Sequence, residues 1–189
     1  MGFLGRIFSR MVSQRKEGKI VLLGSSGAGK TTLVRYLETG EPVKADPKTT
    51  LGIDIRKTPI NIDGWSFKAI DVGGQEIYQK TFWTLAISQA NAIIYVIDGT
   101  MKPDETNANL ELAQFQFEYM LNLTSKNVPL LILINKQDLK SLKPLTIQEA
   151  IELYRMDQIN GRSFTILPSS AKYGDGVQKA MQWLVSRMS

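Results

Sequence analysis

The sequence predicts an α/β fold in which a mostly parallel sheet is covered by helices on both faces. From Lys19 onward, short runs rich in β-branched residues alternate with longer amphipathic segments, a pattern typical of parallel strands joined by crossover helices. The turn at Asp63-Gly64 is a strong hairpin signal and predicts one antiparallel strand. At 189 residues, the chain is the size of one domain with an appendage.

Six strands and five helices are expected in this order. The strands are placed at residues 19–23, 53–60, 65–71, 92–98, 128–134 and 164–168, with the second and third forming the antiparallel hairpin. The helices are placed at residues 30–38, 78–89, 105–123, 147–154 and 176–188. The loop 39–51 between the first helix and the hairpin is rich in Gly, Pro, Lys and Thr, and this composition favours a functional loop.

The amino-acid composition limits which side chains can catalyse a reaction or bind a metal. The chain has no cysteine and no histidine, so carboxylates, hydroxyls and backbone groups must carry any reaction or metal site. Its formal charge is +5, and residues 1–19 carry +4 of it, with five basic residues against Glu17. A basic terminus on a nearly neutral domain points to an anionic membrane surface and away from nucleic acid. The longest apolar runs are too short to cross a bilayer.

A phosphate-binding loop is predicted directly after the first strand. The segment 24–31 fits G-x-x-x-x-G-K-[ST] and opens the first helix, which is the context that this motif requires. Its backbone N–H groups would face phosphate oxygens, Lys30 would bridge the β- and γ-phosphates, and the Thr31 hydroxyl would bind Mg²⁺. The nucleotide-binding residues expected here are Gly24, Ser25, Ser26, Gly27, Ala28, Gly29, Lys30, Thr31 and Thr32.

A second phosphate contact is predicted where the third strand ends, at Asp71-Val72-Gly73-Gly74-Gln75. Asp71 is expected in the second shell of the magnesium ion, and the Gly74 amide next to the γ-phosphate. Gln75 would orient the attacking water, and with Lys30 it is the expected catalytic residue.

Guanine recognition is predicted at the ends of the last two strands. Asp138, in Asn135-Lys136-Gln137-Asp138, can accept hydrogen bonds from the ring N–H and the exocyclic amine of guanine together. Asn135 and the stem of Lys136 would brace the loop and cover the ring. A second loop, Ser170-Ala171-Lys172, would offer the Ala171 N–H to the guanine carbonyl. Adenine lacks this donor pair, which argues against an adenylate-using P-loop kinase.

In this order the motifs resemble those of the Ras-like small GTPases, and among them the Arf family: G-x-x-x-A-G-K-T-T, T-x-G, D-V-G-G-Q, N-K-Q-D and a final G-D-G. The resemblance implies GTP and GDP as ligands, Mg²⁺ as cofactor, and activating, exchange and effector proteins as partners. It implies that Thr50 is a magnesium ligand in the GTP state, that residues 39–51 form switch I, and that residues 73–80 form switch II. The chain departs from the family pattern at Ser26, where an Asp is usual, and at Ile53, Ile70 and Leu85, where an aromatic trio is usual.

An amphipathic helix is predicted at the N-terminus, within residues 1–18, ahead of a GTP-binding domain at 19–189. Its apolar face would hold Phe3, Leu4, Ile7, Phe8 and Met11, opposite a basic face. The resemblance implies that GTP shifts the hairpin and releases this helix to a membrane, so we expect a cytoplasmic protein that is reversibly peripheral on membranes. Arg6 departs from the Ser or Thr of the myristoylation signal that Gly2 would otherwise begin.

Slow GTP hydrolysis is expected, because no arginine lies between Tyr36 and Leu51 to act as a built-in arginine finger. A GTPase-activating protein would then supply the missing charge. The alternative is a non-catalytic scaffold or coat component that is stabilised by GTP, for which Ser26 and the absent arginine leave room.

Overall fold

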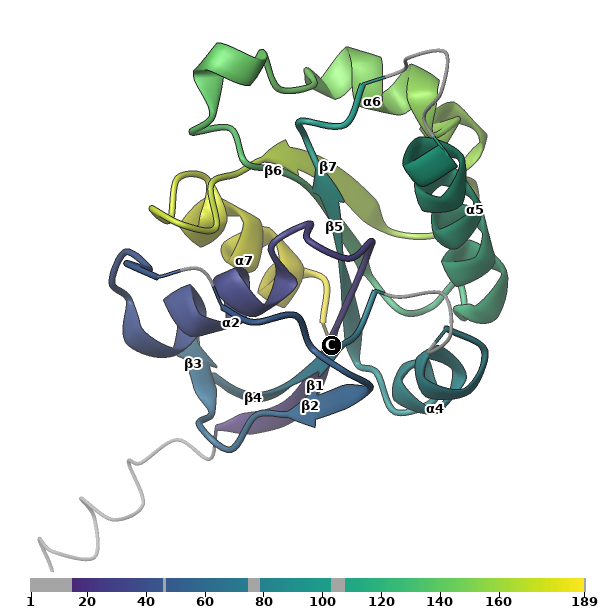
Figure 1. The fold of residues 1–189 in the computed structure, drawn as a ribbon. Coiled ribbons are helices and arrows are strands. Elements are labelled where there is room, and N and C mark those ends of the chain that lie inside the picture. The colour runs from purple at the N-terminus through teal and green to yellow at the C-terminus, as the bar shows by residue number, and fades with distance from the viewer. Residues whose placement is uncertain (1–14, 46, 75–78, 103–107, 189) are drawn as a thin grey trace, which may run out of the picture.

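The computed structural model describes residues 15–45, 47–74, 79–102 and 108–188 (Figure 1). The predicted membrane residues Phe3, Leu4, Ile7, Phe8 and Met11 lie outside these ranges, and so does Gln75. Within the described ranges, no helix is both long and apolar enough to span a membrane.

The fold class predicted from the sequence is confirmed: one mostly parallel sheet runs through the molecule. The strands follow the order β2-β4-β1-β5-β6-β7. β2 pairs with the end of β4, and β3 pairs with its beginning. Their bounds are β1 Lys16–Leu23, β2 Ile53–Ile55, β3 Ile60–Ile62, β4 Trp65–Val72, β5 Ala92–Asp98, β6 Leu130–Asn135 and β7 Phe164–Pro168. All neighbours from β4 to β7 pair in parallel, while β2 and β3 both run antiparallel to β4.

The antiparallel edge differs in detail from the prediction. The expected single strand at 53–60 is divided into β2 and β3, so the sheet has seven strands where six were expected. Pro59 lies in the break, where its missing N–H is of no consequence to the ladder. On the opposite side of β4, β1 begins at Lys16, three residues before the predicted start, and pairs there with Trp65 of β4.

Helices cover both faces of the sheet (Figure 1). Helices α2 and α7 pack on one face, and α4, α5 and α6 pack on the other. Their bounds are α2 Lys30–Thr39, α4 Thr84–Ile87, α5 Ala108–Leu123, α6 Ile147–Leu153 and α7 Val177–Ser186. Three short helical turns join them: a π-helical turn at Gln79–Trp83 and 3₁₀ turns at Lys140–Leu142 and Met156–Gln158. The helix predicted at 78–89 is therefore irregular at its start and ends at Ile87.

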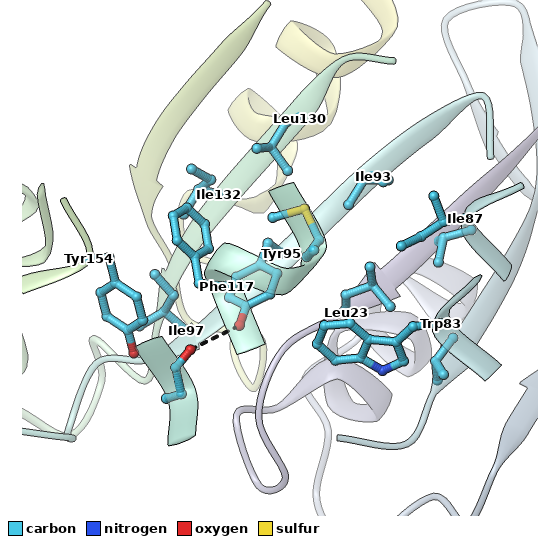
Figure 2. Packing of buried hydrophobic residues seen from close by; sticks show 14 of the residues in the cluster. Leu23, Trp83, Ile87, Ile93, Tyr95, Ile97, Phe117, Leu130, Ile132 and Tyr154 are labelled. Carbon is cyan, nitrogen blue, oxygen red and sulfur yellow. Dashed lines mark hydrogen bonds between the residues drawn. The ribbon is translucent and has the colours of Figure 1, made fainter. Parts of the chain in front are cut away.

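Successive side chains of each strand point to opposite faces of the sheet, so the hydrophobic core forms two layers, one on each face. On the face of α5, the rings of Tyr95 and Phe117 meet edge to face at 4.9 Å between centroids, with Tyr154 beyond them (Figure 2). Burial raises the pKa of the Tyr95 hydroxyl far above its usual range, so this group stays neutral and donates to the Ala113 carbonyl at 3.4 Å. Trp83 is also fully buried in this layer and ties the segment after β4 to the core. The loops at the carboxyl ends of the strands are thus held on a rigid base.

Candidate functional site

The phosphate-binding loop joins β1 to α2 and lies against the neighbouring strand ends. Gly29 has a φ of 101°, and a Cβ there would come within 2.2 Å of Asn135 Nδ2, so only glycine fits. Lys30 opens α2 and is buried, with its Nζ donating to the carbonyls of Gly24 and Ser25 at 2.8 Å each. The helix N-terminus and the lysine together form a site for an anion.

The electrostatics of Lys30 fit that reading. Burial lowers the pKa of its ammonium to about 8, against an opposing attraction from Asp71. A bound phosphate would add a second negative charge close to the ammonium and favour its charged form. The loop therefore has a cation that gains free energy from an anionic ligand.

Three oxygen-bearing side chains meet beside Lys30 at a single corner. Thr31 Oγ1 donates to Asp71 Oδ2 at 2.5 Å, Thr50 Oγ1 donates to the same oxygen at 3.0 Å, and the two hydroxyl oxygens lie 2.9 Å apart. When each hydroxyl proton is directed at Asp71, the oxygen lone pairs of Thr31 and Thr50 remain available for a cation. Adjacent ligands of octahedral Mg²⁺, with bonds of 2.0–2.1 Å, are about 2.9 Å apart. The spacing of the hydroxyls suits two magnesium ligands, with Asp71 behind them.

Asp71 itself gives a second test of fit for a divalent cation. Its carboxylate is fully buried, and its Oδ1 has no hydrogen-bond partner. Burial raises the pKa of this carboxyl group, while the hydrogen bonds from Thr31 and Thr50 and the charge of Lys30 act in the opposite direction. A cation, or a water molecule bound to one, would satisfy the orphaned oxygen. The residues present therefore fit Mg²⁺.

The segment after β4 is pressed against the phosphate-binding loop. A Cβ added to Gly74 would lie 2.4 Å from Gly24 O, Ser25 C and Ser26 N, so this approach also requires glycine. Gly73 N–H donates to the Gly52 carbonyl at 2.8 Å, which joins the segment to the loop that carries Thr50. The phosphate-binding loop, the segment after β4 and the loop that carries Thr50 therefore lie next to one another.

Side-chain hydrogen bonds hold the predicted base loops in place. Asn135 donates from Nδ2 to the Ala28 carbonyl at 2.8 Å and so braces the phosphate-binding loop. Ser170 Oγ donates to Asp138 Oδ1 at 2.7 Å and fixes the orientation of that carboxylate. Lys136 donates to Asp98 Oδ2 at 2.6 Å, which holds its stem at the edge of the cavity.

One backbone amide of the base loops has a partner that was not predicted. The Ala171 N–H was expected to donate to the guanine carbonyl, but here it donates to Asn135 Oδ1 at 2.8 Å. The side chain of Asn135 links both loops, and the spacing of two separate motifs gives no sign of such a link. Guanine contact by this amide would require that the Asn135 bond be exchanged.

A cavity of about 370 Å³ brings most of the predicted nucleotide-binding residues together. The predicted residues that line it are Ser26, Gly27, Gly29, Lys30, Thr31, Thr32, Thr50, Gly74, Asn135, Lys136, Asp138, Ala171 and Lys172. Four predicted residues do not line the cavity but are hydrogen-bonded to residues that do: Gly24, Ser25, Ala28 and Ser170. Lining residues that were not predicted are Pro47, Lys48, Thr49, Gly73 and Leu139. These residues could have been predicted from their closeness in sequence to Thr50, Gly74 and Asp138.

Comparisons with known proteins agree with this site. The sequence model of the ADP-ribosylation factor family matches residues 4–188. The chain is 31% identical to ADP-ribosylation factor-like protein 3 of Chlamydomonas reinhardtii, over 93% of this chain and 94% of that protein. It is also 31% identical to ADP-ribosylation factor-like protein 1 of Saccharomyces cerevisiae, over 96% of each.

A solved structure shows the same fold at lower sequence identity. The small GTPase Arl6 (BBS3) of Trypanosoma brucei, solved with the nucleotide analogue GppNp, superposes with a TM-score of 0.75 and 22% identity, covering 92% of this chain and 100% of that one. The family model and the curated relatives, which agree with the phosphate-binding loop and the N-K-Q-D loop, show that the chain belongs to the ADP-ribosylation factor family of small GTP-binding proteins.

Proposed function

We propose that the chain is a GTP-hydrolysing switch with a low intrinsic rate, which a GTPase-activating protein accelerates and an exchange protein resets. The observation that carries the proposal is the hydroxyl corner, where Thr50 meets Thr31 and Asp71. Thr50 belongs to the loop between the first helix and the hairpin, so its hydroxyl would hold that loop at this corner while Mg²⁺ and a γ-phosphate are bound. Hydrolysis would remove the γ-phosphate and release it.

We assign three roles in the reaction to residues of this chain: phosphate binding, metal binding and positioning of the attacking water. Lys30 and the N–H groups of the phosphate-binding loop would hold the phosphates, and Thr31 and Thr50 would hold Mg²⁺, whose charge would offset the charge that develops on the phosphates. Gln75 follows Gly74 in the sequence, and we assign it the positioning of the attacking water. A low rate is expected because Lys48 is the only basic residue of the 39–51 loop that lines the cavity, and no arginine is present there.

Gln75→Leu is the variant that tests the catalytic part of this proposal. Leucine cannot bind water, so the single-turnover rate of GTP hydrolysis should fall at least about a hundredfold, the usual scale for a lost positioning group. GTP affinity should stay within about threefold, because Gln75 is assigned no part in ground-state binding. The measurement is the release of labelled phosphate from preloaded protein.

Two outcomes of that assay would contradict the proposal. If the wild-type chain shows no hydrolysis above the rate of free GTP, the alternative of a GTP-stabilised scaffold or coat component replaces it. If the wild-type chain turns over several GTP molecules per minute without a partner, the low rate and the need for an activating protein are wrong.

Membrane coupling is the second part of the proposal, with residues 1–18 as an amphipathic helix that is released in the GTP state. The hairpin that would move is held weakly at its end: β2 has three residues, and its Asp54 lies opposite Asp71 in the ladder. Arg56, directly after β2, joins this end of the hairpin to α2 through a bidentate pair with Glu38, at 2.9 and 2.6 Å, and also bonds to Asp54 at 2.9 Å. Leu51, Ile55 and Leu85 are exposed, and we assign these apolar side chains to contact with effectors.

Flotation on anionic vesicles tests this coupling. Protein loaded with a non-hydrolysable GTP analogue should float to a greater extent than protein loaded with GDP, because the helix adds apolar and basic contacts only when it is released. Phe3→Ala combined with Phe8→Ala should abolish the difference, since burial of each phenyl ring contributes about 1.5–3 kcal/mol. Equal flotation in both nucleotide states, or no effect of the double substitution, would show that the terminus has another role.

A further inference from the structure

A buried glutamine on α5 contacts both phosphate-facing segments. Gln116 is fully buried, and its Nε2 donates to the Gly74 carbonyl at 3.1 Å. Its Oε1 accepts from Ser25 Oγ at 2.9 Å. Gln116 does not line the nucleotide cavity, and it lies 42 residues from Gly74 and 91 from Ser25 in the sequence. Both ends of one side-chain amide are therefore used to join two distant loops.

We propose that Gln116 is a positioning residue that couples the phosphate-binding loop to the catalytic segment. The Gly74 carbonyl belongs to the peptide bond that leads into Gln75, so the bond from Gln116 fixes the orientation of that peptide. Ser25 fixes the other end, and the Ser25 carbonyl in turn accepts from Lys30 Nζ at 2.8 Å. Hydrogen bonds thus connect Lys30 to Gly74 through Ser25 and Gln116. The functional meaning of this connection rests on the roles proposed above for Lys30 and Gln75.

The chemistry of the contact requires an amide. Gly74 offers a carbonyl and needs a donor, whereas Ser25 offers a hydroxyl that donates. A carboxylate would accept from Ser25 and face the Gly74 carbonyl with a second acceptor. An apolar side chain would leave the Gly74 carbonyl without this bond, and an unpaired buried carbonyl is costly. Filling the core would not need this arrangement, because Phe117 and Ala113 of the same helix are apolar and pack there.

The two bonds are compatible only while Gly74 is seated against the phosphate-binding loop, where the space for a Cβ is absent. Gln116 therefore stabilises that arrangement relative to any in which the segment moves away. A residue with such a difference in contacts shifts the equilibrium between the two arrangements. Because Gly74 is the residue assigned to the γ-phosphate, Gln116 should favour GTP over GDP as well as align Gln75.

The test compares Gln116→Met, Gln116→Glu and Ser25→Ala with the wild-type chain. Gln114→Met is the matched control, since Gln114 lies on the same helix and donates its amide to a backbone carbonyl, that of Leu153, at 2.8 Å. Three quantities are measured for each protein: the single-turnover rate of GTP hydrolysis, the affinity for GDP and the affinity for GTPγS. Thermal unfolding of each variant shows the cost of losing a buried bond in itself.

Gln116→Met should lower the hydrolysis rate about tenfold and the ratio of GTPγS to GDP affinity about tenfold, the equivalent of about 1.4 kcal/mol or one hydrogen bond. GDP affinity should remain within about threefold of wild type. Gln116→Glu should be impaired at least as much as Gln116→Met, because an ionised carboxylate loses the donor and also buries a charge beside the Gly74 carbonyl. Ser25→Ala should give a smaller effect of the same sign and add nothing to Gln116→Met, as expected for groups in one chain of bonds.

Several outcomes would overturn the coupling. One is an unchanged affinity ratio in both Gln116→Met and Ser25→Ala, as in Gln114→Met, and another is wild-type behaviour of Gln116→Glu. Ser25→Ala removes only one half-buried hydroxyl, so it remains informative if Gln116→Met does not fold. A wild-type chain that binds but does not hydrolyse GTP would refute the catalytic proposal alone, and the affinity ratio would then decide the coupling. A wild-type chain that binds no guanine nucleotide would refute both.

Discussion

Asp138→Asn is expected to lower the affinity for GTP at least about a hundredfold and to raise the affinity for xanthosine triphosphate. Asp138 lines the cavity, and the hydrogen bond from Ser170 Oγ to its Oδ1 fixes the orientation of the carboxylate. Hydrogen bonds to a charged group contribute about 1.5–3 kcal/mol each, and asparagine replaces one of the two acceptors with a donor. Xanthine has a carbonyl in place of the guanine amine, so the new donor finds an acceptor there.

Competition against a fluorescent guanine nucleotide measures both affinities. Asp175→Asn is the control, because Asp175 lies in the neighbouring loop, is exposed and does not line the cavity. It removes the same charge and should leave both affinities within about twofold, the size of a distant surface charge effect. If Asp138→Asn loses GTP without gaining xanthosine triphosphate, the carboxylate supports the loop and does not read the base.

Lys30→Met is expected to weaken binding of both GDP and GTP at least about a hundredfold, because two or more charge-assisted bonds to phosphate are lost. Methionine has nearly the same length and removes a charge whose burial already lowers its pKa to about 8. The nucleotide-free protein should therefore remain folded, which circular dichroism would show. The loss would belong to the site and not to the fold.

Lys126→Met controls for the change of side chain, since Lys126 is exposed and donates to Asn160 away from the cavity. Calorimetric titration with GDP and with GTPγS gives the two affinities directly. An unchanged GDP affinity in Lys30→Met would mean that the lysine serves only to brace the carbonyls of Gly24 and Ser25, and the assignment of the phosphate end of the site would be wrong.

The residues of the candidate site could be proposed from the sequence because each contact motif is local and follows a strand. Gly24, Asp71, Asn135 and Ser170 each lie at or just after a strand end, and parallel strands place those ends at one edge of the sheet. The fold class follows from the same alternation of strands and helices. Local patterns suffice where a backbone element alone sets the position of a side chain.

Features that depend on long-range partners could not be found in this way. Gln116 has no motif around it, and its function as a bridge becomes visible only when α5 packs beside the loops of Ser25 and Gly74. The bond from Ala171 to Asn135 joins two motifs whose mutual distance the sequence does not encode. The break between β2 and β3 was missed because the apolar residues on either side of Pro59 continue the strand pattern.

The affinity of the wild-type chain for GTP and for ATP, each with Mg²⁺ and with a chelator, tests the central claim most directly. We expect GTP to bind at least about a thousandfold more tightly than ATP, because adenine would leave the Asp138 carboxylate unpaired. Chelation should weaken GTP binding at least about tenfold, since Thr31, Thr50 and Asp71 are arranged for a cation. Equal affinity for the two nucleotides, or GTP binding that is indifferent to the metal, would contradict a magnesium-dependent guanine nucleotide switch.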